Sequence, residues 1–239
     1  MNTLRHAEEF REILQSYVMS ATSRELLSRT NFIMLSAITA SGRNTIIEEL
    51  LNTEQFYPVI SDTTREKRLN DGVLEQDGVQ YWFRSEEEVL ERLKQGKYIE
   101  AALIHDQQVS GLSIEEFDKA AQANKLAITD LEVQGVEVIM KANPEAIAIF
   151  VVPPSYDEWM NRWVKRGAIA DLEKQHRMES ARNELQTALN TGYYHFVIND
   201  ALPEVVQDIT DIAHGKADPN KERAAKQVAE RLLDRLQKH

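Results

Sequence analysis

The chain has 239 residues, of which 42% are hydrophobic and 28% charged, an ordinary composition for one large globular domain. Its formal net charge of −11 disfavours non-specific binding to nucleic acid or to an anionic membrane, so a bound phosphate would need a local group of arginines and lysines. The chain has no cysteine, which excludes disulfides, thiolate metal sites and a cysteine nucleophile. Because it also shows no secretory signal and no apolar run of bilayer length, we expect a cytoplasmic protein without a membrane partner.

Both ends of the sequence predict helices. Within the first thirty residues an apolar face recurs at helical spacing and would pack on the domain. Its members are Phe10, Ile13, Leu14, Tyr17 and Val18. The segment from Pro219 onward is a charged helix with a stripe of Val228, Leu232 and Leu236. That stripe would pack on the domain or on a partner, so a homodimer is an open alternative.

Between the ends, short apolar runs alternate with helical stretches. Continuous apolar runs suit strands buried on both faces, and the alternation predicts a parallel sheet with helices on both sides. The expected strands are 32–35, 57–60, 126–129, 146–152 and 195–198. The expected helices are 44–51, 115–123, 137–142 and 156–189, the last with a break. The segment 62–110 interrupts this order and predicts an inserted lobe, with short strands at 80–83 and 97–104 around a helix at 86–94.

Ligands of such a sheet bind beyond the carboxyl ends of the strands, so the residues after each strand carry the functional signal. Residues 37–45, which we name the phosphate loop, occupy the place of a G-x-x-x-x-G-K-[ST] motif after the first strand. Only Gly42 keeps the motif residue, because Ala37, Arg43 and Asn44 replace the first glycine, the lysine and the hydroxyl. By itself this segment favours a tight turn that binds no ligand.

A group of basic and hydroxyl residues follows the second strand. Arg65 and Arg68 lie three residues apart, beside Ser61, Thr63 and Thr64. Two guanidinium forks suit a phosphate, although this segment alone favours a solvated basic loop.

Read together from about Phe32 to about Ile212, the segments resemble the guanylate kinase family. Residues 61–68 resemble its S-x-T-T-R-x-x-R pattern, residues 75–83 its E-x-D-G-x-x-Y-x-F pattern, and residues 98–100 the segment that ends in a glutamate. Residues 130–135 resemble its D-I-D/E-V-Q-G pattern and residues 153–155 its P-P-S. Residues 162–167 with Arg177 resemble its arginine lid, and residues 197–200 its V-N-D.

The resemblance implies an α/β P-loop kinase fold, a five-stranded parallel sheet flanked by helices, with an inserted mononucleotide-binding lobe and a helical lid. The expected divisions are an N-terminal helical extension (1–30), a guanylate-kinase-like domain (31–214) and a C-terminal helix (215–239). Within the domain, residues 62–112 would form the GMP-binding lobe and residues 156–190 the lid and its following helix.

The resemblance also implies transfer of the γ-phosphoryl group of ATP to GMP, giving ADP and GDP. Magnesium would arrive with ATP and not in a dedicated protein cage, so no residue is expected to be a metal ligand. Matching positions for GMP are Ser61, Arg65, Arg68 and Tyr81 at the phosphate and Glu100, Asp130 and Glu132 at guanine. Those for the ATP phosphates are Thr39, Ala40, Ser41, Gly42, Arg43, Asn44 and Thr45, with Asn199 near adenine. The expected catalytic arginines are Arg43, Arg162, Arg166 and Arg177.

Several departures from the family pattern concentrate in the phosphate loop, which predicts a weakened donor site. An arginine keeps the charge of the missing lysine but is larger, and an amide replaces the magnesium-binding hydroxyl. Residues 109–111 read Val-Ser-Gly where the family has Y-Y-G, and about four extra residues lie around 71–74. Two alternatives stay open: a catalytically silent module that binds GMP or a phosphorylated partner, and a related kinase with another acceptor.

Overall fold

The computed structural model describes residues 4–70, 72–104, 106–165 and 171–238, and these residues form two compact units. The first unit comprises residues 1–31, 57–127 and 138–145, and the second comprises residues 32–56, 128–137 and 146–239. Two strands and one helix of the fold run across the boundary between them. None of the helices described is both long and apolar enough to cross a membrane.

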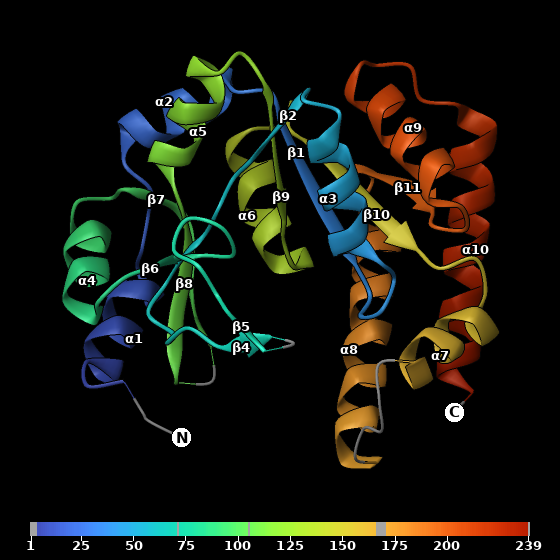
Figure 1. Cartoon of the computed structure of the whole chain (residues 1–239), viewed down its shortest axis with the longest axis horizontal. Helices are drawn as coiled ribbons and strands as arrows, with labels where there is room; N and C mark the ends of the chain where they lie inside the picture. The colour runs from blue at the N-terminus through green and yellow to red at the C-terminus, as the bar shows by residue number, and fades with distance from the viewer. Residues whose placement is uncertain (1–3, 71, 105, 166–170, 239) are drawn as a thin grey trace. The chain divides into compact units, whose positions relative to one another are not determined.

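The second unit is built on the predicted sheet (Figure 1). Its strand order is β11-β10-β1-β9-β2, and the ladders β1–β10 and β10–β11 are parallel. The bounds are β1 Phe32–Ala37, β2 Phe56–Pro58, β9 Leu126–Asp130, β10 Ile147–Val152 and β11 Tyr194–Ile198. Strands β1 and β10 are buried almost throughout, as their continuous apolar sequences require. The predicted five-stranded parallel sheet is therefore confirmed.

Helices flank this sheet, as expected. α3 packs against β1 and α9, while α10 packs against α8 and β11 (Figure 1). Their bounds are α3 Arg43–Asn52, α6 Val133–Ala142, α7 Tyr156–Lys165, α8 Asp171–Asn190, α9 Leu202–Ala213 and α10 Pro219–Gln237. Helix α9 was not predicted from the sequence; it has a proline in its first turn and buries Val205, Ile209 and Ile212.

The first unit contains the inserted lobe. Its four-stranded sheet has the order β6-β3-β8-β7, and a separate hairpin pairs β4 with β5. The strands are β3 Asp62–Thr63, β4 Leu69–Asn70, β5 Val73–Leu74, β6 Trp82–Phe83, β7 Tyr98–Ile104 and β8 Gln108–Ser113. The helices are α4 Glu86–Lys94 and α5 Ile114–Gln122. Strand β8 was not predicted, because its sequence QVSGLS lacks an apolar run, although four of its six residues are buried.

The N-terminal segment forms two helices, α1 Ala7–Gln15 and α2 Ala21–Arg29. Phe10 is fully buried in a cluster with α4 and β7, and Ile13, Leu14 and Tyr17 pack against that cluster. The expected apolar face is wrong at one position, because Val18 is 68% exposed. Helix α1 ends before Tyr17, so the helical spacing no longer applies to the two residues at 17 and 18.

Helix α10 packs on the second unit through the predicted stripe. Val228, Leu232 and Leu236 are all buried, and Arg182 of α8 donates to the Leu236 carbonyl at 2.7 Å. The Arg235 guanidinium also lies over the Tyr156 ring of α7, 5.3 Å from its centroid. The C-terminal segment is therefore an integral part of the packed core of this unit.

We expect Leu232→Ala to lower the free energy of unfolding by about 2 to 3 kcal/mol, since it deletes a fully packed side chain and leaves a cavity. Urea unfolding monitored by fluorescence measures the change, with the exposed Gln227→Ala of the same helix as a control. Equal stabilities for the two variants would show that α10 contributes little to the fold.

Candidate active site

In the inserted lobe, Arg65 is held at the end of a short strand. Its Nη1 and Nη2 donate to the two carboxylate oxygens of Glu75 at 2.7 and 3.0 Å, and Nη1 also donates to the Glu66 carbonyl at 2.8 Å. The guanidinium lies over the rings of Tyr81 and Phe83, 5.1 and 5.6 Å from their centroids. Arg65 is thereby fixed in one orientation before any ligand binds.

The carboxylate of Glu75 is the centre of this arrangement. Its side chain is 6% exposed, and besides Arg65 it accepts a hydrogen bond from the backbone N–H of Arg68 at 2.8 Å. The hydrogen bonds from Arg65 to this carboxylate raise the pKa of the guanidinium above its usual value, despite the opposing effect of burial. A planar bidentate pair of this kind sets both the position and the charge of the arginine.

A second buried carboxylate supports the strand that leads to Arg65. Asp62 accepts a hydrogen bond from the Tyr98 hydroxyl at 2.7 Å and lies 3.1 and 3.6 Å from the Nε atoms of Arg92 and Arg84. Burial raises the pKa of Asp62 although the tyrosine and both arginines favour its ionised form. These contacts fix the position of β3, the strand that directly precedes the loop containing Arg65.

The other residues predicted for GMP in this lobe have different surroundings. Ser61 is half-buried and its carbonyl accepts from the Trp82 N–H, while Arg68 is exposed. Glu100 is half-buried on β7, opposite Leu112 of β8. Where the family pattern has a second tyrosine, Ser110 donates its hydroxyl to Thr63 at 3.0 Å and so braces the arginine-bearing loop.

The phosphate loop in the second unit turns between β1 and α3 with two residues in the left-handed region. Ala40 has a φ of 64° and Gly42 has a φ of 88°. A Cβ at Gly42 would lie 2.3 Å from the amide nitrogen of Asn199, so only glycine fits there. Ala40 carries a Cβ in a conformation that costs of order 1 kcal/mol for a residue other than glycine. The loop keeps its turn despite this substitution.

Three side chains, two from α7 and one from the turn after β11, hold the carbonyls of this loop. Asn199 donates to the Ser41 carbonyl at 2.7 Å, and Trp159 donates to the Thr39 carbonyl at 2.7 Å. Arg162 donates to the carbonyls of Ser41 and Asn199 at 3.3 and 2.8 Å. With its carbonyls bonded from outside, the loop can present its N–H groups to a bound anion. The buried Ser41 hydroxyl has no hydrogen-bond partner in the described part of the chain.

Two of the predicted catalytic arginines, Arg43 and Arg177, are already paired with carboxylates. The Nη2 atom of Arg43 lies 2.8 Å from Asp130, which is half-exposed at the end of β9. Asn44, Thr45 and Glu132 are exposed. Arg177 of α8 pairs with Glu173 one turn before it. Arg166, also predicted as a catalytic arginine, lies outside the described residues.

Comparison with known proteins then decides the family. The guanylate kinase family model matches residues 29–215, which include both the arginine-bearing lobe and the phosphate loop. The chain belongs to the guanylate kinase family. The two N-terminal helices and helix α10 lie almost entirely outside the family match.

Guanylate kinases from several organisms resemble this chain. That of Listeria monocytogenes is 34% identical over 189 residues, which cover 78% of this chain and 89% of the relative. Guanylate kinase 1 of rice is 32% identical over 180 residues, covering 74% of this chain but 46% of the plant protein. The chain thus spans about half the length of the plant relatives. A crystal structure of guanylate kinase from Anaplasma phagocytophilum shares the fold with a TM-score of 0.57 and 20% identity, covering 87% of this chain and 95% of the other.

Two residues that contact predicted site residues were not themselves predicted as site residues. Glu75 could be identified only as part of a motif, because it is one of four acidic residues between Arg65 and Tyr81 and the sequence does not show which of them pairs with the arginine. Trp159 could not be identified as a loop-contacting residue from the sequence, because an aromatic residue on an amphipathic helix usually packs in the core. Only the structure shows that its indole N–H donates to a carbonyl of the phosphate loop.

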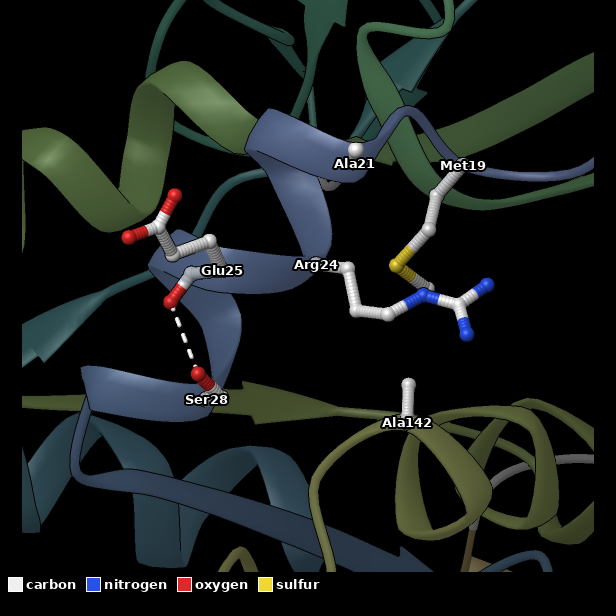
Figure 2. Close-up of a pocket in the computed structure, with 6 residues that line it drawn as sticks. All are labelled: Met19, Ala21, Arg24, Glu25, Ser28 and Ala142. Atoms are coloured by element: carbon white, nitrogen blue, oxygen red, sulfur yellow. Dashed lines mark hydrogen bonds between the residues drawn. The ribbon is translucent and has the colours of Figure 1, made fainter.

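A separate hollow of about 620 Å³ lies beside α2 in the first unit (Figure 2). Among its lining residues only Arg24 and Glu25 are charged. The remaining lining residues are Met19, Ala21, Ser28 and Ala142. It contains none of the predicted nucleotide-binding residues.

Proposed function

We propose that this protein is a nucleoside monophosphate kinase that transfers the γ-phosphoryl group of ATP to GMP, giving ADP and GDP. The observation that carries the proposal is the family match across both the arginine-bearing lobe and the phosphate loop. Phosphoryl transfer needs positioning and charge neutralisation more than covalent chemistry, and pre-oriented arginines supply both. A coupled ADP-release assay with GMP, dGMP, AMP, UMP and CMP as acceptors tests it, and turnover with GMP and dGMP alone is the expected result.

The lobe is the proposed acceptor site. Arg65, fixed by Glu75, would receive the GMP phosphate together with Arg68, Ser61 and the Tyr81 hydroxyl. Arg65 keeps guanidinium donors that Glu75 does not use, because an arginine has five N–H groups and two of its nitrogens face the carboxylate. The exposed Arg68 can turn toward the phosphate at small cost.

We expect Glu100→Gln to weaken GMP binding by roughly 1 to 3 kcal/mol, because a carboxylate accepts from the N1–H and the exocyclic amine of guanine. Adenine lacks this pair of donors, so AMP should bind more weakly than GMP to the unmodified protein. Isothermal titration calorimetry with GMP and AMP measures both effects. Equal affinities for the two nucleotides would show that Glu100 does not recognise the guanine base.

The donor site is proposed to be weakened, not lost. Ala40 holds a turn that glycine adopts without strain, and Arg43 is engaged by Asp130 where a lysine would present a compact charge to the phosphates. The described residues contain no group of three or more carboxylate or histidine side chains that could hold a metal ion. The oxygens of the exposed Asn44 and Thr45 are hard donors that fit magnesium, through water, so we propose that these residues would contact a magnesium ion that arrives with ATP.

Restoring the loop with Arg43→Lys and Asn44→Ser should raise kcat, because an ammonium and a hydroxyl replace the bulkier fork and the amide. Steady-state kinetics with saturating GMP and magnesium check this, with Lys165→Arg on α7 as a charge-preserving control. If neither the natural chain nor the restored loop gives GMP-dependent ADP, the silent nucleotide-binding module replaces the kinase as the function.

A further inference from the structure

Glu116 of α5 is a buried carboxylate whose hydrogen-bond partners come from three different segments of the first unit. Only 2% of its side chain is exposed. One oxygen accepts from the backbone N–H of Ile60 at 3.2 Å. The other oxygen accepts from the indole N–H of Trp82 at 3.1 Å and from the ammonium group of Lys119 at 2.6 Å. Both carboxylate oxygens are therefore engaged as acceptors.

Ser61 lies inside a ring of contacts that begins and ends at this carboxylate. Residues 59–61 connect β2 with β3 and belong to neither strand, so their position depends on contacts from outside. Ile60, whose N–H donates to Glu116, directly precedes Ser61. The Ser61 carbonyl accepts from the Trp82 N–H at 2.9 Å, and the indole of Trp82 returns to Glu116. The backbone of Ser61 is thus held from both sides.

The charge of Glu116 is balanced within the same ring. Lys119 follows three residues later on α5, and its ammonium group also lies 4.6 Å from the centroid of the Trp82 ring. A buried ion pair adds little net stability compared with packed apolar residues of similar size. It does add direction, because a charged acceptor holds its donors in short, oriented hydrogen bonds. We therefore expect Glu116 to affect the orientation of Ser61 more than the stability of the unit.

We propose that Glu116 is a positioning residue that holds the Ser61 hydroxyl where it donates to the phosphate of GMP. This inference rests on the proposed function, in which Ser61 is one of the residues that receive that phosphate. Glu116 lies outside every segment that resembles the family motifs, and Trp82 occupies the variable position of the Y-x-F pattern. Glu75 orients Arg65 in the same lobe. With Glu116 acting on Ser61, the phosphate would meet two donors that are oriented independently.

The test is calorimetric titration with GMP, which measures binding without requiring phosphoryl transfer. Glu116→Gln keeps the shape of the side chain, but its amide group donates where the carboxylate accepts, so one of the three donors loses its acceptor. The dissociation constant for GMP should rise about tenfold, the loss expected for one hydrogen bond to a charged group. The matched control is Asp118→Asn, an exposed position of the same helix that should bind GMP like the natural protein.

A positioning role can be separated from a structural one because it acts through Ser61. Ser61→Ala alone should also raise the dissociation constant for GMP about tenfold. When position 61 is already alanine, adding Glu116→Gln should raise it by less than about twofold, since changes to one shared contact do not add. A non-hydrolysable ATP analogue should bind to Glu116→Gln as it binds to the natural protein.

A second variant tests the same ring from its other side if Glu116→Gln does not fold. Trp82→Phe keeps an aromatic ring beside Lys119 but removes the indole donor. Its dissociation constant for GMP should rise about threefold, the scale of one ordinary hydrogen bond. This rise should also disappear when Ser61 is replaced with alanine.

Glu116 has no positioning role if Glu116→Gln, or Trp82→Phe where the first does not fold, binds GMP as tightly as the natural protein. The same follows if the effect multiplies in full with that of Ser61→Ala, or if the natural protein does not bind GMP. A protein that binds GMP with the expected dependence on Glu116 but forms no GDP retains this role and loses the proposed kinase activity. GDP formation by a protein whose variants bind GMP normally gives the opposite result.

Discussion

Replacing Arg65 with alanine is expected to raise the KM for GMP by about a hundredfold or more and to leave the KM for ATP within about twofold. The reason is that a charge-assisted, two-point contact to a phosphate is worth about 3 kcal/mol, and about 1.4 kcal/mol is a factor of ten in affinity. Helix α3 and the phosphate loop do not contain this residue, so the donor nucleotide should be affected little. Initial rates with each nucleotide varied in turn give the two constants.

The alanine variant alone is ambiguous, because it leaves Glu75 buried without its cation. Breaking such a pair from one side costs about 3 to 5 kcal/mol, which could unfold the lobe. The double change Arg65→Ala with Glu75→Gln removes the charge from both sides and keeps the test interpretable. Lys67→Ala, an exposed cation two residues away, controls for the loss of net charge. If the double variant bound GMP normally while Lys67→Ala did not, Arg65 would not be the residue that binds the GMP phosphate.

The sheet could be predicted from the sequence because its strands are buried on both faces. Residues 147–152, for example, are all apolar, so their composition alone predicts a buried strand. The inserted lobe was harder, since β3, β4, β5 and β6 have two residues each and their pairing depends on partners far along the chain. Strand β3, for example, is anchored by a tyrosine 36 residues later.

The residues of the candidate site could likewise be predicted only in part. The positions of Gly42, Arg65 and Asn199 could be predicted because each belongs to a motif with fixed spacing. Their partners could not, because a hydrogen bond from Asn199 to the Ser41 carbonyl joins residues 158 apart in the chain. Sequence spacing identifies residue types at a site, whereas their protonation and pairing depend on the packed fold.

Replacing Arg162 with alanine is expected to lower kcat for GMP phosphorylation by about a thousandfold, the scale known for loss of an arginine that stabilises the charge of a transferring phosphoryl group. Its guanidinium now bonds the carbonyls of Ser41 and Asn199 beside the phosphate loop. Moving toward a phosphate would cost little at Ser41, because that carbonyl keeps its bond from the Asn199 amide. Rapid-quench measurement of a single turnover, together with the dissociation constant for ATP, tests the expectation.

The competing explanation is that Arg162 acts only by holding the loop in shape. In that case Asn199→Ala, which removes the shorter bond to the same carbonyl, should reproduce the whole effect of Arg162→Ala. Both variants would then raise the dissociation constant for ATP and leave the rate at saturation nearly unchanged. If Arg162 instead reaches the reacting phosphate, Asn199→Ala should weaken ATP binding, whereas Arg162→Ala should lower the rate at saturating ATP.

Lys165→Ala, an exposed cation one turn later in α7, should change neither quantity and so excludes a general effect of charge. The two side chains share one backbone carbonyl, so the difference between their variants isolates the contribution of the positive charge.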